Sequence, residues 1–177
     1  MIDLETLSTK SNAVILSIGA CYFNPYNQTV GDVFHQHIDI QSCLNNGMDI
    51  SASTLTWWIG QNMKARKTLI NGQKDSKHLS NALLNLSNFI LGDCRVWGNG
   101  STFDITILET AYELIHEPPP WKFYNVRDCR TVEQLAYGML DKKTVRFAGT
   151  QHDALADACH QAKYISMMYK LLKVNRP

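Results

Sequence analysis

The chain has 177 residues, a length that fits one domain with a substantial core. Its net charge of +1 excludes a global basic field for nucleic acid, so a site for a polyanion must be local or assisted by metal ions. The apolar content of 45% is typical of globular proteins. No apolar run approaches the roughly 20 residues that span a bilayer, and no leader pattern begins the chain, so we expect a cytoplasmic protein without membrane attachment.

The five cysteines are scattered without a C-x-x-C pair, in an odd number and at irregular spacing. This pattern indicates neither a disulfide framework nor a zinc ribbon. We expect most of them to be small apolar core residues in a reducing compartment.

The first forty residues predict three consecutive strands. A short leading strand covers residues 1–5, and a β-rich run over 13–23 ends at the turn signal Asn24-Pro25. Residues 32–40 alternate with period two, which predicts the second strand of a hairpin.

After these strands, the apolar residues recur mostly at helical spacing. The predicted elements are a helix within 51–66, a helix over 80–91, a short strand over 94–98, a helix over 104–116, a strand over 123–126, and helices over 131–139 and 153–173. Three leading strands followed by alternating strands and helices predict an α/β domain over residues 1–177, with a mixed five-stranded sheet flanked by helices.

Asp3 and Glu5 stand two residues apart on the first predicted strand, so both side chains leave the same face. Their Cα atoms should be about 6.5–7 Å apart, and such a pair can bracket two divalent ions about 3.5–4 Å apart. Buried without a cation, the two carboxylates would repel each other. Taken alone, the pair is better explained as a solvent-facing strand start.

Asp104 follows a strand and the Gly98-Asn-Gly100 turn, at the predicted start of a helix. Ligand sites of α/β sheets gather where strands end and helices begin. Taken alone, Asp104 is better explained as a charge favoured by the helix dipole.

The stretch "HDALAD" carries two aspartates four residues apart on one helix face. Capping explains Asp153, whereas Asp157 lies among apolar neighbours, where an unpaired charge is costly and a cation is needed. His152 stands on the preceding loop and can turn toward the same cation. We expect His160 to be an exposed helix histidine rather than a partner of Asp157.

In this order, the five residues resemble the DEDDh group of 3′–5′ exonucleases, with "IDLET", "GNGSTFD" and "HDALAD" as its three motifs. The resemblance covers nearly the whole chain. Within that group, "MIDLETLSTKSNAVILSIGACYFNP", "STLTWWIGQNMKAR" and "NVRDCRT" look like a phage and prophage branch. That branch is often labelled exodeoxyribonuclease VIII-like and is related to a mycobacterial exoribonuclease and a phage exonuclease subunit.

The resemblance implies a ribonuclease H-like fold and release of nucleoside 5′-monophosphates from the 3′ end of single-stranded DNA or RNA. Carried over residue by residue, it implies that two Mg²⁺ or Mn²⁺ ions are bound by Asp3, Glu5, Asp104 and Asp157. It assigns His152 as the general base. It also allows a homodimer, and the choice between DNA and RNA stays open.

Further candidates for substrate contact are Trp57, Trp58, Gln61, Phe103, Arg127 and Arg130. One of the two adjacent tryptophans could stack on a terminal base, and both could equally be core or interface residues. Each arginine could contact phosphate or pair with Asp128. The loop over 141–149 could close over a 3′ end or be a solvated turn.

Two alternatives stay open at this point. The chain could be a catalytically silent nucleic-acid-binding or interaction module on the same fold. An endonuclease on a related fold is disfavoured by the His152–Asp157 pair and by the absence of a strongly basic groove.

Only Met1 and Ile2 precede Asp3, fewer residues than in the resembled group, which suggests an internal start or a short, frayed first strand.

Overall fold

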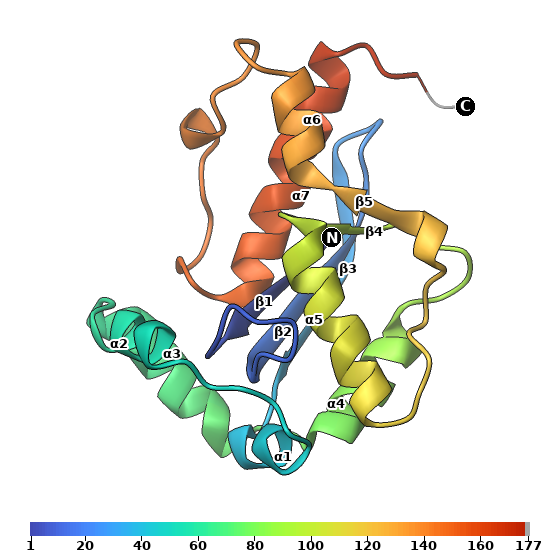
Figure 1. The fold of residues 1–177 in the computed structure, drawn as a ribbon. Helices are drawn as coiled ribbons and strands as arrows, with labels where there is room; N and C mark the ends of the chain where they lie inside the picture. The colour runs from blue at the N-terminus through green and yellow to red at the C-terminus, as the bar shows by residue number, and fades with distance from the viewer. Residues whose placement is uncertain (176–177) are drawn as a thin grey trace.

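The computed structural model describes residues 1–175. The strands and helices are, in chain order, β1 Ile2–Thr6, β2 Ile15–Asn24, β3 Thr29–His37, α1 Ile40–Asn45, α2 Ala52–Ile59, α3 Met63–Lys74, α4 Leu79–Phe89, β4 Val96–Gly98, α5 Ser101–Leu114, β5 Val126–Asp128, α6 Cys129–Leu135 and α7 Ala154–Leu171 (Figure 1). Single 3₁₀ turns occur at Phe123–Asn125 and Lys142–Thr144.

The strands form two hydrogen-bonded groups. β1, β2 and β3 form an antiparallel sheet in that order, and β4 pairs with β5 in parallel. β1 lies beside β4, although the ladders recorded within residues 1–175 do not join the two groups. The predicted α/β class is confirmed, while the ribonuclease H-like arrangement stays a prediction.

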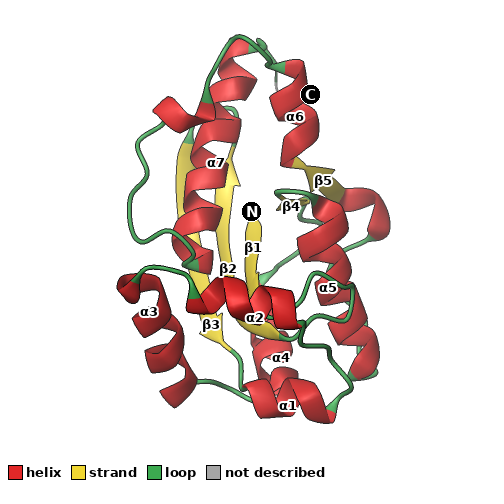
Figure 2. Ribbon diagram, turned by 60° about the vertical axis from the view of Figure 1, so that its left-hand side comes forward, coloured by secondary structure: helices red, strands yellow, loops and turns green. Residues whose placement is uncertain are grey.

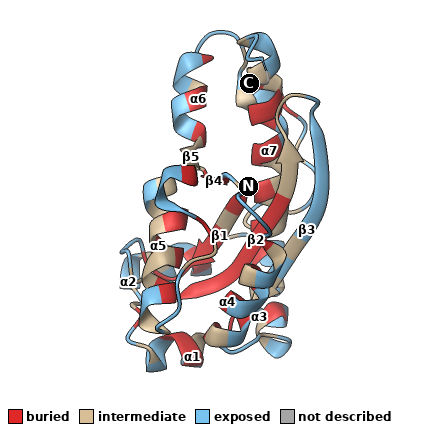
Figure 3. Ribbon diagram, turned by 90° about the vertical axis from the view of Figure 1, so that its right-hand side faces the viewer, coloured by how far each residue is buried: buried red, intermediate tan, exposed pale blue. Residues whose placement is uncertain are grey.

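The alternation of side chains along β1 separates its two faces. Ile2 and Leu4 belong to the core that is shared with α4 and α5. Asp3 and Glu5 therefore point to the opposite face, which α7 covers along β1 and β2 (Figure 2). Figure 3 shows the buried residues concentrated on β1 and β2, whereas β3 is mostly exposed.

Capping residues account for two differences from the predicted helices. Asp39 ends the run predicted as a strand and accepts hydrogen bonds from the N–H groups of Gln41 and Ser42, which starts the unpredicted helix α1. The helix predicted within 51–66 is two helices, because Ser51 caps α2 and Asn62 caps α3. A side-chain oxygen at such a position satisfies N–H groups that a continuous helix would use differently.

Two further boundaries differ near the glycine turn. Residues 123–125, predicted as a strand, form a 3₁₀ turn closed by the Asn125 N–H to Lys122 carbonyl hydrogen bond of 2.8 Å, and β5 follows it. Helix α5 begins at Ser101, after Gly100 adopts a φ of 100° that favours glycine. Asp104, predicted as the first residue of this helix, consequently lies three residues inside it, in the first turn of α5.

No helix among the described residues is long and apolar enough to cross a membrane. The five cysteines are free thiols, and Cys21, Cys43 and Cys129 are buried.

Candidate active site

Three of the predicted carboxylates meet on the α7 side of β1. Asp3, Glu5 and Asp157 each offer an oxygen, and these oxygens lie within 4.8 Å of one another. Two come from one strand and the third from a helix more than 150 residues later in the chain. Hard carboxylate oxygens at this separation are ligands that suit Mg²⁺ or Mn²⁺.

Gly19 is the residue of β2 that lets α7 approach this closely. It pairs with Asp3 across the ladder, and a Cβ built on it would stand 2.1 Å from the carbonyl carbon of Ala154. The first turn of α7 therefore rests directly on the β2 backbone. Asp157 follows within that turn, which brings its carboxylate to Asp3 and Glu5.

Asp104 lies at the border of this group. It is 3% exposed, and its Oδ1 accepts a hydrogen bond of 3.2 Å from the N–H of Leu4, between Asp3 and Glu5 in the chain. Burial raises the pKa of Asp104 to about 7, against the opposing effect of backbone hydrogen bonds and the Arg130 charge. The charge of Asp104 in turn raises the pKa of Asp3 and of Glu5, so the four acids interact electrostatically.

The surroundings of Asp3, Glu5 and Asp157 raise the pKa values of these acids and so disfavour their ionised forms. Burial and then the charges of Asp104, Glu5 and Asp157 raise the pKa of Asp3. Burial and then the Asp157 charge raise the pKa of Glu5 to about 8, and burial raises the pKa of Asp157. The ion pairs found within residues 1–175 do not include these acids. A divalent cation would offset this repulsion.

His152 is fixed beside Asp157 by its backbone. Its N–H donates a hydrogen bond of 2.9 Å to Oδ2 of Asp157, and its φ of 62° is rare for a residue with a side chain. The imidazole packs edge-on against the ring of Trp57, at 4.9 Å between centroids. This turn places the histidine between the carboxylates and helix α2.

The two adjacent tryptophans have different environments. Trp58 is 4% exposed, and its Nε1–H donates a hydrogen bond of 2.8 Å to the carbonyl of Thr6. Trp57 is 45% exposed and is the one that contacts His152 more closely. Gln61 donates its side-chain amide to the carbonyl of Trp57, which occupies that amide at the end of α2.

The remaining residues predicted to contact substrate have different surroundings. The guanidinium of Arg130 lies against Gly100, and its charge acts on Asp104. Arg127 instead donates to the carbonyls of Tyr124 and Val126. Phe103 is half-buried against the core that β1 shares with α4 and α5.

The alternative in which an arginine pairs with Asp128 was wrong. No ion pair within the described part of the chain joins Asp128 to Arg127 or Arg130. The Asp128 carboxylate accepts backbone N–H groups from Ser101 and from the first turn of α6. It therefore ties the starts of α5 and α6 together, and this leaves Arg130 free of a carboxylate partner there.

The expectation of an exposed His160 was also wrong. Its ring is half-buried between Phe147, at 4.9 Å between centroids, and Tyr164, at 5.5 Å. Phe147 belongs to the loop over 141–149, and Lys142 of this loop forms an ion pair of 2.7 Å with Glu133. The loop over 141–149 is consequently attached to α6 and α7 at two places, because its aromatic and basic side chains find partners there.

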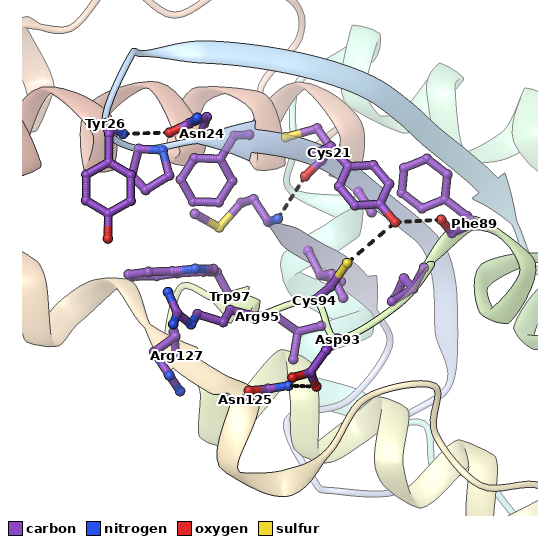
Figure 4. Close-up of a pocket in the computed structure, with 18 of the residues that line it drawn as sticks. Cys21, Asn24, Tyr26, Phe89, Asp93, Cys94, Arg95, Trp97, Asn125 and Arg127 are labelled. Atoms are coloured by element: carbon purple, nitrogen blue, oxygen red, sulfur yellow. Dashed lines mark hydrogen bonds between the residues drawn. The ribbon is translucent and has the colours of Figure 1, made fainter. Parts of the chain in front are cut away.

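A cavity lies away from the carboxylates. It measures about 570 Å³ and is lined by residues of β2, β4 and the chain start, with Cys21, Tyr26, Trp97 and Arg127 among them (Figure 4). The amino group of Met1 donates a hydrogen bond to the carbonyl of Cys21 inside it. Arg127 lines this cavity, whereas none of the four acids does.

One residue of the site escaped the sequence analysis. Gln161 is buried on α7, and its Nε2 donates a hydrogen bond of 2.7 Å to Oδ1 of Asp3. The available signal was its spacing of four from Asp157, which places both side chains on one helix face.

Comparison with known proteins identifies the family. A family model described as the 3′–5′ exoribonuclease Rv2179c-like domain matches residues 1–169. No curated protein matches the sequence. The match agrees with the resemblance to a mycobacterial exoribonuclease, while the DEDDh group and the phage branch stay predictions. Since the match covers all but the last few residues and includes every acid of the site, the chain belongs to the 3′–5′ exoribonuclease Rv2179c-like family of nucleases.

Proposed function

We propose that this protein is a metal-dependent 3′–5′ exonuclease that removes nucleoside 5′-monophosphates from single-stranded RNA. The observation that carries the proposal is the meeting of Asp3, Glu5 and Asp157 within 4.8 Å, beside Asp104. The family name supplies RNA as the preferred substrate, which the sequence left open against DNA. Residues 1–177 act as one catalytic domain.

In this proposal the four acids bind two Mg²⁺ or Mn²⁺ ions. Asp3, Glu5 and Asp157 supply the oxygens that already converge. Asp104 supplies Oδ2, because its Oδ1 accepts the Leu4 N–H. When bound, the two metals lower the pKa of the attacking water and offset charge on the scissile phosphate. A protein with a net charge of +1 thereby acquires a local attraction for a polyanion.

His152 is the general base that takes the proton from the attacking water. The hydrogen bond from its backbone to Asp157 fixes its position relative to the metal ligands. The packing against Trp57 restricts the imidazole ring. The exposed face of Trp57 is suited to stack the terminal base, a contact worth about 1–3 kcal/mol, and Arg130 is suited to hold a phosphate.

The test is a time course with single-stranded RNA in Mg²⁺, labelled at either end. We expect mononucleotides from the 3′ label at once, and a ladder that shortens stepwise from the 5′ label. His152→Ala should lower kcat by about 10²–10⁴-fold, the usual contribution of a general base. His35→Ala, an exposed histidine on β3, is the matched control and should cleave normally.

Three results would contradict the proposal. Cleavage that is equal in the wild type and in His152→Ala would remove the histidine from catalysis. Tight RNA binding without turnover at any metal concentration would identify a silent binding module instead. Faster digestion of a matched DNA strand would reverse the assignment of RNA.

A further inference from the structure

Gln161 is a buried polar residue that the proposed reaction does not yet use. It is 5% exposed and lies one helical turn after Asp157 on α7, facing β1. Its Nε2 is 2.7 Å from Oδ1 of Asp3. An ionised Asp3 carboxylate can only accept hydrogen bonds, so in that state the NH₂ end of the amide must face it, as it does in the structure.

The other end of the amide argues against a purely structural role. Oε1 of Gln161 is buried and has no hydrogen-bond partner among the described residues. A buried acceptor without a partner costs free energy, so an apolar side chain of similar length would serve helix packing better. The contact with Asp3 is the feature that an apolar side chain could not supply.

The surroundings of Asp3 show what this contact does. Burial and the charges of Asp104, Glu5 and Asp157 all oppose the ionised carboxylate, and the hydrogen bond from Gln161 favours it. The same bond holds Oδ1 of a carboxylate that has an oxygen within 4.8 Å of oxygens of Glu5 and Asp157. Partners that orient a metal ligand in this way commonly set how tightly the metal binds.

We propose that Gln161 is a positioning residue, whose amide N–H holds the Asp3 carboxylate in the orientation that a divalent cation requires. This inference rests on the proposed metal-dependent function. It adds a residue on α7 that controls metal affinity without touching the substrate.

The experiment compares Gln161→Met and Gln161→Asn with the wild type. Methionine keeps the length of the side chain without the donor, and asparagine keeps an amide that is one methylene too short. Mn²⁺ binding is measured without substrate from the spin-resonance signal of free Mn²⁺, and melting temperatures show whether each variant folds. Ser166→Ala, another buried polar position on α7, is the matched control because its hydroxyl donates to the carbonyl of Ala162 and, within residues 1–175, not to an acid of the site.

We expect the Kd for Mn²⁺ to rise by about 10–100-fold in both variants, as for other partners of metal ligands. The KM for RNA at saturating metal should stay unchanged, and Ser166→Ala should bind Mn²⁺ as the wild type does. A folded Gln161→Met or Gln161→Asn with wild-type Mn²⁺ affinity would overturn the inference. If methionine prevents folding, the asparagine variant decides. A wild-type protein that binds no Mn²⁺ would overturn the proposed function itself, a result distinct from failure of Gln161 alone.

Discussion

Two acidic regions, one beyond the end of β1 and one on β1 itself, have surroundings that act on the carboxylate charge in opposite ways. Beyond its end, Asp49 accepts hydrogen bonds from the Ser8 hydroxyl at 2.6 Å and from the Lys10 ammonium at 2.9 Å. These two partners hold the pKa of Asp49 below its usual value. Within β1, Glu5 lies among other acids, and burial followed by the Asp157 charge raises its pKa to about 8.

The contrast separates an acid that has partners of its own from acids that we propose bind metal ions. Where an acid only joins two loops, the chain provides its own cation. Where several acids are buried together without one, they reduce stability, and such groups are candidates for a functional site. The comparison therefore predicts opposite signs for substitutions in the two regions.

The largest effect is expected for Glu5→Gln, which removes a proposed metal ligand with almost no change in shape. Cleavage of RNA should fall to the background rate. In the presence of a chelator the melting temperature should rise, by about 2–4 °C for each kcal/mol of repulsion removed. Calorimetry with and without chelator checks this. A variant that melts below the wild type in metal-free buffer would show that the acids do not repel each other in the fold.

The next effect is expected for Gly19→Ala, which would separate Asp157 from Asp3. The added Cβ meets the Ala154 backbone at 2.1 Å, so α7 must shift away from β2. The free energy of unfolding should fall by about 1–3 kcal/mol or more, as in overpacked cores, and Mn²⁺ affinity should fall with it. Gly31→Ala on β3 is the control, because its nearest neighbour would lie at an ordinary 3.6 Å. Urea denaturation should distinguish the two, and equal midpoints would contradict the close approach.

A smaller effect is expected from pH in the metal-free protein. The pKa of Glu5 rises from 4.5 to about 8 on folding and that of Asp104 from 3.8 to about 7. At pH values between the unfolded and the folded pKa of each acid, the folded state binds more protons than the unfolded state. The free energy of unfolding should therefore fall as pH rises from about 5 to 8. Saturating Mg²⁺ should reduce this slope. Stability that is constant over this range in chelator would contradict the raised pKa values.

The smallest effect is expected for Asp49→Asn. Because the pKa of Asp49 is lowered on folding, the contribution of its charge is present above the unfolded pKa and is lost as pH falls through the folded value. The substitution should lower the melting temperature slightly at neutral pH and hardly at all in strong acid, with RNA cleavage unchanged. A loss of activity would mean that the two acidic regions are coupled.

The long and strongly patterned parts of the fold were predictable from the sequence. The amphipathic run after Asp153 is helix α7, and Asp153 caps it as expected by accepting the N–H of Ala156. Short elements were not, because one capping side chain decides them. Asp39 starts α1 within a run that alternates like a strand, and a single turn replaces the first three residues of the strand predicted over 123–126.

For the site, the sequence indicated which residues to consider and the structure decided their neighbours. The spacing of Asp3 and Glu5 fixed their common face in advance, since side chains alternate along a strand. The closeness of Asp157 to Asp3 depended on the absence of a side chain at Gly19, and the contact of Gln161 with Asp3 depended on the same docking of α7. Neither the approach of Asp157 to Asp3 nor the hydrogen bond of Gln161 to Asp3 can be read from the spacing of residues along one element.

The sequence by itself determined the α/β class, the acids at their two-residue and four-residue spacings, and the turn that carries His152. These are properties of neighbouring residues, whose geometry follows from the period of a strand or a helix. Only the tertiary structure decided that Asp3, Glu5 and Asp157 share one site, that Trp57 rather than Trp58 is exposed beside it, and that Arg127 lies elsewhere. Those facts depend on how closely α7 and α2 pack against the sheet, which is set by contacts between residues far apart in the chain.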